Sequence, residues 1–422
     1  MHDPILARLG ERVRPTGLWL HSGFRKFWAA ETTSAIGSQV TVVALPLLAA
    51  LALDASPAQM GLLFAAGTAP FLLIGLFVGV WVDRVRRSPL LIAADLARAA
   101  LLAMIPVAWI IGWLSMGLLY TVALGSGALT VVFEVASLSI LPALVDWGSL
   151  VEGNGKLEAS RSLAQIGGPG IAGWLVGLVG APLAILLDAV SYIVSAAFLT
   201  RMAKLSPEKI PTLSSHESRH VLKDAVEGLR TVFAHSLLRS LVLCSANINF
   251  FGFVFLSVYV LYLTRDLGLG PSAVGLVFAL GGVGALLGAL AANPAARRLG
   301  QGPAMAVSMV LCGLFGLAIP LAVVFPTVAL PMVLAAEFAQ WLFLVVYRVS
   351  EVSACQAATP DALLGRVNAT QRFMVYGSIP LGGLLGGFLG EVIGVPITLV
   401  VGMLGMLLSS VWLFHPSVRS LR

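Results

Sequence analysis

The chain has 422 residues, of which 58% are hydrophobic and only 11% are charged, and its mean hydropathy is +0.95. A soluble domain is nearer half apolar and a quarter charged, so this chain has too little polar surface to cover a water-exposed core. We therefore predict an integral membrane protein. Its net charge of +6 is spread over many short loops, which argues against a nucleic-acid partner.

Motifs for catalysis, nucleotide binding and metal binding are missing from the sequence. It has no Gly-x4-Gly-Lys-Ser/Thr loop for ATP, no Gly-x-Ser-x-Gly elbow and no His-Glu-x-x-His zinc pair. The three cysteines, Cys244, Cys312 and Cys355, are dispersed and lack the spacing of metal ligands. We expect no enzyme, no metal site and no bound cofactor.

Runs of about 20 mostly apolar residues, the length that a membrane-spanning helix needs, follow one another along the chain. The expected spans are 27–53, 57–82, 89–111, 116–144, 160–179, 183–201, 240–263, 272–292, 303–324, 328–353, 369–390 and 396–414. Nearly all lysines and arginines fall in the N-terminus and in every second loop, which places both termini in the cytoplasm. The sequence thus predicts an all-α protein with twelve transmembrane helices.

The chain divides into two related halves. Arg161 lies eight residues before Pro169, and Arg372 lies eight residues before Pro380, in a second glycine-rich helix. This repeat predicts two pseudo-symmetric six-helix bundles with the substrate path between them. The expected order is a cytoplasmic segment at 1–26, a first bundle at 27–201, a linker with an amphipathic helix at 202–239, a second bundle at 240–414 and a cytoplasmic tail at 415–422.

Two motifs resemble signatures of the major facilitator superfamily. One is the hairpin Gly79-x3-Asp83-Arg84-x-Arg86-Arg87 between helices two and three, and the other is Gly168-Pro169-Gly170-Ile171-Ala172-Gly173 in helix five. Further stretches are similar to the macrolide-efflux and enterobactin-exporter branch of drug:proton antiporters: 27–31, 90–98, 152–161, 187–189 and 364–370. The resemblance implies the major facilitator fold and export across the prokaryotic inner membrane, driven by the proton gradient.

The hairpin motif suggests a latch between the two halves. Gly79 leaves one helix face bare, so that a neighbour can approach closely. We expect Asp83 to contact the positive N-terminal dipole of helix eleven, near Thr370, when the cytoplasmic side is closed. Arg84 and Arg87 would hold this acid in place or reach Glu134 or Asp146.

The helix-five motif combines three glycines, Gly168, Gly170 and Gly173, with Pro169. These residues remove side chains and one backbone donor, which permits close packing and a bend. We expect a seal against the other half that forms and breaks during transport. The alternative is tight packing without a switching role.

Three intramembrane carboxyls are candidates for proton coupling, because ionisable groups in a bilayer are costly and usually functional. Glu337 lies about 14 Å into its span with no basic residue within one turn; the alternative is a neutral structural carboxyl. Glu134 either faces the cavity or pairs with Arg84 or Arg87. Asp188 resembles a recurrent aspartate of the branch, or serves only as a structural hydrogen-bond acceptor.

In the superfamily, helices one, four, seven and ten line the cavity. The candidates for substrate binding on these helices are Glu31, Asn247, Phe251, Glu337, Gln340, Trp341 and Arg348. Several have a second interpretation: Glu31 as a snorkelling interfacial charge, and the aromatic face of helix seven as packing surface. Arg348 either pairs with Glu351, as Asp95 is expected to pair with Arg98 at the same spacing, or binds an anionic group.

These features favour a monomeric secondary transporter that exports lipophilic small molecules, cationic or neutral, by alternating access. Its partners would be a small-molecule substrate and the lipid bilayer, and its energy source the proton-motive force. The alternatives are a narrow exporter of a native metabolite such as a siderophore, a solute importer or facilitator, and a membrane scaffold that transports nothing.

Overall fold

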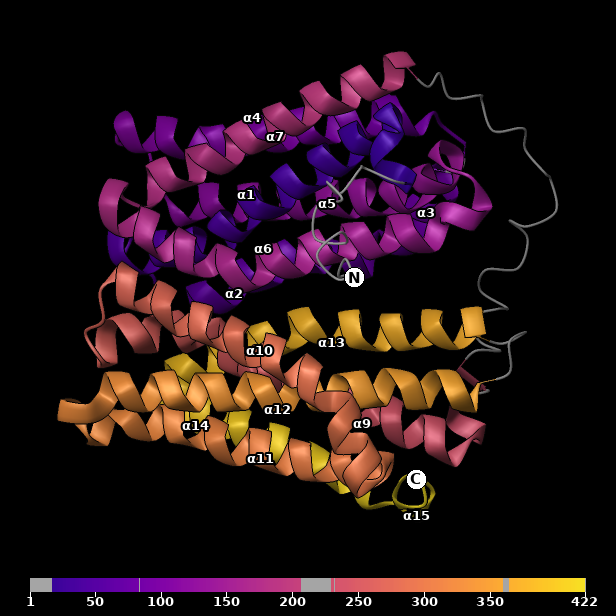
Figure 1. Ribbon diagram of the computed structural model, residues 1–422. Coiled ribbons are helices and arrows are strands. Elements are labelled where there is room, and N and C mark those ends of the chain that lie inside the picture. The colour runs from indigo at the N-terminus through magenta and orange to yellow at the C-terminus, as the bar shows by residue number, and fades with distance from the viewer. Residues whose placement is uncertain (1–16, 83, 206–228, 231, 360–363, 422) are drawn as a thin grey trace, which may run out of the picture.

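The computed structural model describes residues 17–82, 84–205, 229–230, 232–359 and 364–421, and the elements found in these ranges are helices. Two bundles lie side by side, the first in indigo to magenta and the second in orange to yellow (Figure 1). The first contains α1 (Ser22–Ala52), α2 (Pro57–Leu73), α3 (Gly75–Val82), α4 (Arg87–Ile110), α5 (Met116–Leu144), α6 (Leu150–Val179) and α7 (Ala181–Leu205). The second contains α9 (Ser236–Leu261), continued by a π-helical turn, α10 (Pro271–Leu299), α11 (Gln301–Leu321), α12 (Ala329–Ala358), α13 (Leu364–Ile393) and α14 (Val395–Leu408).

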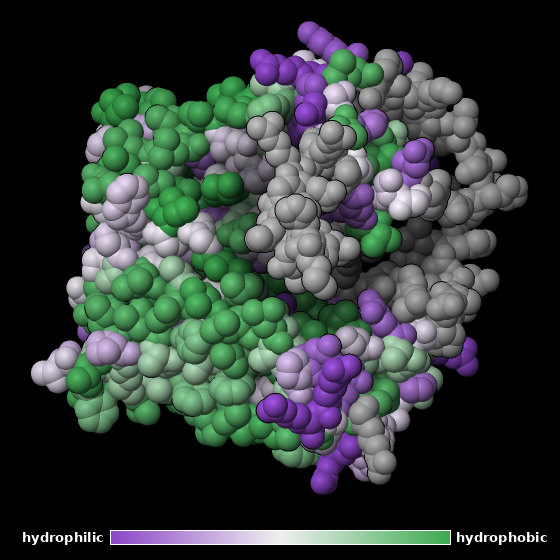
Figure 2. All heavy atoms as spheres, in the orientation of Figure 1, coloured by the Kyte–Doolittle hydropathy of each residue, from purple (hydrophilic) through white to green (hydrophobic). Residues whose placement is uncertain are grey.

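The bundles have two chemically different ends. We call the end where α7 stops at Leu205 and α9 starts at Ser236 the linker end, and the opposite one the distal end. Apolar side chains cover the flank of both bundles, whereas hydrophilic side chains gather toward the linker end (Figure 2). A continuous apolar flank is the surface that a lipid bilayer covers. The protein is a multi-pass membrane protein.

Eleven helices of the described chain are long and apolar enough to cross a membrane. The predicted continuous helix over 57–82 is instead interrupted at Ile74, which leaves α2 with 17 residues and α3 with 8. Pro70 supplies no N–H and Gly75 has no Cβ, and both weaken a helix at this point. The amphipathic helix predicted within the linker falls mostly outside the described residues.

The two bundles contact each other along two helix pairs, α2 with α13 and α6 with α10. Glycines make both contacts possible. A Cβ on Gly61 would lie 2.7 Å from the Cα of Gly387, and a Cβ on Gly173 would lie 2.3 Å from the Cα of Gly275. No real Cβ tolerates such distances, so these helices touch through their backbones. Both contacts lie toward the distal end.

Polar contacts also join the bundles at the distal end. An Arg265 nitrogen, Nη2, lies 2.6 Å from Oδ1 of Asp54, in the opposite bundle, and the backbone N–H of Ala58 donates to Glu391 at 3.2 Å. Asp54 has φ +47, which is unusual for a residue with a side chain. In the second bundle Gly268, at φ +64, likewise stands three residues before a helix-starting proline. Asp54 therefore occupies the position that Gly268 occupies in the corresponding loop of the second bundle.

Asp54→Asn is expected to weaken distal closure without straining the loop, since asparagine tolerates positive φ as well as aspartate does. Both partners are partly or fully exposed, so the population should shift toward the distal-open state by no more than about fivefold. The measurement is maleimide labelling of Ala279→Cys, a residue that faces Gly170 across the α6–α10 contact, in a background whose three native cysteines are buried. Glu152→Gln, an exposed acid paired with Lys156 at the linker end, is the matched control. Equal labelling of Asp54→Asn and wild type would contradict a role for this ion pair in closure.

Candidate substrate cavity and its ionisable network

Two adjoining cavities lie between the bundles. The first, of about 380 Å³, is lined mainly by α1, α5 and α6, and we call it the N-wall cavity. The second, of about 480 Å³, is lined by α9, α12 and α13, and we call it the C-wall cavity. Both include Tyr376 of α13, so the two cavities meet there. Each has the size of a small-molecule site.

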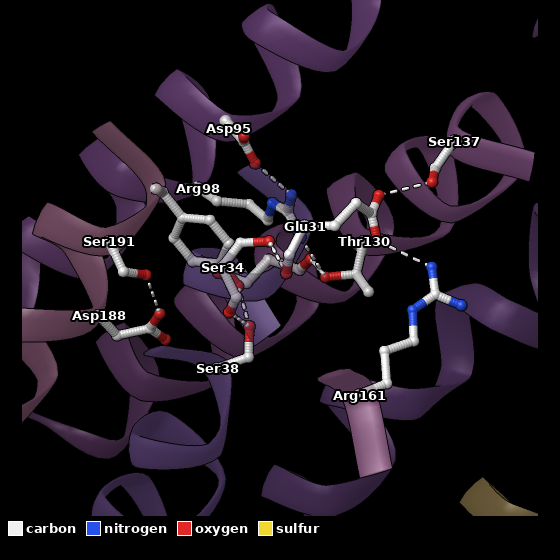
Figure 3. A network of polar contacts seen from close by, with 12 residues as sticks. Glu31, Ser34, Ser38, Asp95, Arg98, Thr130, Ser137, Arg161, Asp188 and Ser191 are labelled. Atoms are coloured by element: carbon white, nitrogen blue, oxygen red, sulfur yellow. Dashed lines mark hydrogen bonds and ion pairs between the residues drawn. The ribbon is translucent and has the colours of Figure 1, made fainter. Parts of the chain in front are cut away.

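The buried Glu31 carboxylate joins three helices on the N-wall through an ion pair with the partly exposed Arg161 and a hydrogen bond from Ser137. Glu31 of α1 is 5% exposed, accepts a hydrogen bond from Ser137 of α5 at 2.5 Å, and pairs with Arg161 of α6 at 2.8 Å (Figure 3). Its carboxylate is thus fully engaged inside the protein, and the interpretation of Glu31 as a snorkelling interfacial charge is wrong. Glu134 and Glu158 line the same cavity and are exposed within it.

Arg98 of α4 is held in a second buried cluster. Its guanidinium contacts Asp95 and lies between the rings of Phe133 and Tyr192, at 4.3 and 4.2 Å from the ring centroids. This confirms the predicted Asp95–Arg98 pair. Two aromatic faces stabilise a cation that has lost most of its water. Arg98 also borders the N-wall cavity.

Among the described side chains that line the C-wall, the exposed charge is Arg348 of α12. Its Nη2 donates to Oδ1 of Asn249, on α9, at 3.3 Å. Glu351, one turn further, is 4% exposed and accepts instead from Gln371 of α13 at 2.6 Å. Arg348 and Glu351 are close enough for their charges to interact, but the hydrogen bond of each side chain goes to another helix.

This architecture, two bundles with a polar cavity between them, can be compared with known proteins. The family model described as "transmembrane secretion effector", a model of the major facilitator superfamily, matches residues 18–421. The chain belongs to this family. It is therefore a transporter and not an enzyme, and the match confirms the resemblance seen in its motifs.

Individual members of the superfamily resemble the chain over most of its length. It is 28% identical to the multidrug efflux pump Tap of Mycolicibacterium fortuitum, over 93% of this chain and 95% of Tap. It is 27% identical to the enterobactin exporter EntS of Escherichia coli, over 82% and 80%. A bacterial homologue of the iron transporter ferroportin, crystallised in an inward-facing state, shares the fold with a TM-score of 0.74, at 16% identity, over 94% and 98% of the two chains.

Within this major facilitator transporter, Glu337 lies away from both cavities. It is 3% exposed and accepts hydrogen bonds from Tyr259 at 2.8 Å and Trp341 at 2.9 Å. Glu337 and Arg348 share a helix face, since eleven residues make about three turns. Glu337, however, lies nearer the distal end, where Gly281 of α10 packs directly against α12. Neither Glu337 nor the 39% exposed Trp341 is among the lining residues of the two cavities.

The other predicted substrate contacts fall into two groups. Gln340 and Phe251 are packing residues: Gln340 is buried beside Gly316 and Met403, and the Phe251 ring packs against Gly405 of α14. Asn247 is half-buried and is not among the lining residues of either cavity, whereas Asn249 is. Two residues turn a helix by about 200°, so Asn247 and Asn249 face opposite sides.

Asp188 on α7 is not among the lining residues of either cavity. It is 1% exposed and accepts hydrogen bonds from Thr41 of α1 and, at 3.0 Å, from Ser191 on its own helix (Figure 3). These contacts match its alternative interpretation as a structural acceptor that holds α7 against α1. Asp188 and Glu31 are thus buried acids of one bundle in different roles, one joining two helices and one bordering the cavity.

The proposed latch lies at the linker end, and Asp83 is outside the described residues. Arg84 is exposed and Thr370 is buried. Among the described residues, none would come within 4 Å of a Cβ added at Gly79, so the structure shows no close neighbour there in the part that it describes. The described contacts between the bundles gather toward the opposite end.

The helix-five motif splits between two neighbours. Gly170 and Gly173 face α10 of the other bundle, where added Cβ atoms would lie 2.8 Å from the Cβ of Ala279 and 2.3 Å from the Cα of Gly275. Gly168 instead packs against Gln39 of α1, in its own bundle. Pro169 is buried, and its carbonyl oxygen approaches Gly275. The motif therefore packs partly within the first bundle and partly against α10 of the second bundle.

Proposed function

We propose that the chain is a proton-coupled exporter of lipophilic small molecules in the cytoplasmic membrane of a prokaryote. It works as a monomer, needs no cofactor beyond the proton-motive force, and moves its substrate by alternating access. The observation that carries this proposal is the ionisable cavity between two bundles whose distal ends are joined. Similarity to Tap and EntS, both named as exporters, supports the direction.

The geometry corresponds to one end state of that cycle. Backbone contacts of α2 with α13 and of α6 with α10, together with the Asp54–Arg265 pair, hold the distal end closed. The topology that we propose has both termini in the cytoplasm and α2 with α3 crossing the membrane together, as the twelfth span. The cavity then receives substrate from the cytoplasm.

Glu134 is the carboxyl best placed to exchange a proton with the substrate path, since it borders the N-wall cavity near Arg161. Glu337 is shielded beside Tyr259 and Trp341, where a bound proton would relieve the cost of a buried charge. We assign coupling to these two acids. Asp188, tied to α1 by hydrogen bonds, has a structural role.

Transport driven by a pH gradient in everted membrane vesicles tests this assignment. In the Glu134→Gln variant, the rate of gradient-driven uptake of a lipophilic cation such as ethidium is expected to fall at least tenfold, while substrate exchange without a gradient continues. Glu152→Gln, an exposed acid at the linker end, is the matched control and should transport normally. The coupling scheme fails if Glu134→Gln and Glu337→Gln both keep gradient-driven transport.

A narrow exporter of an anionic metabolite is the second candidate function. The observation that favours it is Arg348, the exposed charge of the C-wall, whose hydrogen-bond partner is the uncharged amide of Asn249. This alternative predicts that Arg348→Gln abolishes transport of every substrate. A multidrug exporter would keep its transport of cations in that variant.

A further inference from the structure

The two walls of the cavity carry opposite exposed charge. The N-wall contains three carboxyls, Glu31, Glu134 and Glu158, and two arginines, Arg98 and Arg161. Arg161 is already paired with Glu31, and Arg98 contacts Asp95 behind the wall. When Asp95 is included, carboxyls outnumber arginines on this side of the cavity. The exposed carboxyls are those of α5 and α6.

The C-wall has the reverse arrangement. Among its described lining residues, the acid Glu351 is buried against Gln371, whereas the base Arg348 is exposed toward the cavity. Arg348 lies ten residues from the linker end of α12, or about 15 Å along the helix, within the membrane-spanning segment. A guanidinium at that depth requires an anionic or strongly polar partner when water leaves.

An aromatic surface lies between the charged walls. Tyr376 borders both cavities, and its ring stacks on Phe71 of α2 with centroids 5.4 Å apart. The space thus presents carboxyls on one side, an aromatic face in the middle and a guanidinium on the other side. An apolar molecule with charges at both ends matches that order.

We propose that the preferred substrates are zwitterionic amphiphiles, with an amine that binds the α5–α6 wall and a carboxylate or similar acid that binds Arg348. This inference rests on the proposed exporter function and narrows its substrate class. A zwitterion supplies a counter-charge to both walls at once before the cavity closes and dries. When a simple cation binds, Arg348 has only the buried Glu351 nearby and the uncharged amide of Asn249 as its hydrogen-bond partner, and a charge without a direct counter-ion is expensive in a low-dielectric space.

The test uses one fluorescent naphthalene scaffold in three forms. The first has an amine at one end and a carboxylate at the other, the second is its methyl ester, and the third is its N-acetyl derivative. Counterflow exchange in proteoliposomes measures their uptake without a proton gradient, so a defect in coupling does not interfere. Wild type is expected to exchange the zwitterion at least tenfold faster than either capped form.

Two variants separate the charged ends. Arg348→Gln should remove the preference for the acid over the ester and keep the preference for the amine. Glu158→Gln should do the reverse, and Arg201→Gln, at the exposed linker end of α7, should leave both preferences intact. If Arg348→Gln folds poorly, Arg348→Lys, which keeps the charge, is measured in its place. Binding of the three probes to this variant, followed by their fluorescence in detergent, gives the same comparison.

Equal exchange of zwitterion and ester by wild type overturns the inference, and so does an Arg348→Gln variant that still discriminates between them. The exporter function stands in both cases. If ethidium and all three probes fail to move in either assay, the proposed function itself is wrong.

Discussion

Replacing Arg161 with leucine is expected to lower the free energy of unfolding by about 3 kcal/mol, because it leaves the buried Glu31 carboxylate without its counter-charge. Transport should fall at least tenfold, since the pair ties α1 to α6 across the N-wall. Ser137→Ala removes only one neutral donor to the same carboxylate and should cost about 1–2 kcal/mol. Denaturant unfolding in detergent and uptake in everted vesicles give the two measurements.

The double variant Glu31→Gln/Arg161→Leu shows which part of the effect is electrostatic. Removing both charges eliminates the unpaired carboxylate, so most of the lost stability should return while transport stays low. Arg201→Leu, on the exposed linker end of α7, is the control for loss of an arginine. A double variant as unstable as Arg161→Leu alone would mean that the arginine acts through packing and not through its charge.

The Glu31–Arg161 pair also marks the limit of prediction from sequence. Its partners stand 130 residues apart, and nothing local in α1 or α6 joins them. Apolar runs predicted the helices well, because about 20 apolar residues suffice to define a span. They did not predict the break at Ile74, where a proline and a glycine interrupt an otherwise apolar run.

The orientation of each helix about its axis was harder to predict. On α9 the sequence offers Asn247 and Asn249, and the structure places Asn249 on the cavity, where it contacts Arg348. On α12 the depth of Glu337 was expected to bring it to the substrate, but the glycine contact with α10 at Gly281 covers it. Which face of a helix points into the cavity depends on which helices it contacts. A single sequence indicates these contacts only through its small residues, which allow helices to approach closely.

The second prediction with a large expected effect concerns one of these small residues and uses the variant Gly173→Val. An added Cβ would lie 2.3 Å from the Cα of Gly275 and 2.8 Å from the carbonyl oxygen of Pro271, and all these atoms belong to the backbone. A flexible side chain could move aside, but the backbone of α10 cannot do so without shifting the whole helix. The bundles should therefore separate at the distal end, and transport should fall at least tenfold because one end state of the cycle is no longer reached.

Gly167→Val, six residues earlier on the same helix, is the matched control, because a Cβ at Gly167 meets nothing within 4 Å. It should transport as wild type does. Maleimide labelling of Ala279→Cys should rise in Gly173→Val and stay unchanged in Gly167→Val. Gly387→Val, which would press on Gly61 across the α2–α13 contact, should repeat the effect of Gly173→Val. If transport is lost in Gly173→Val but distal labelling does not rise, the helix-five motif contributes packing within a fixed structure, and the α6–α10 contact does not open during transport.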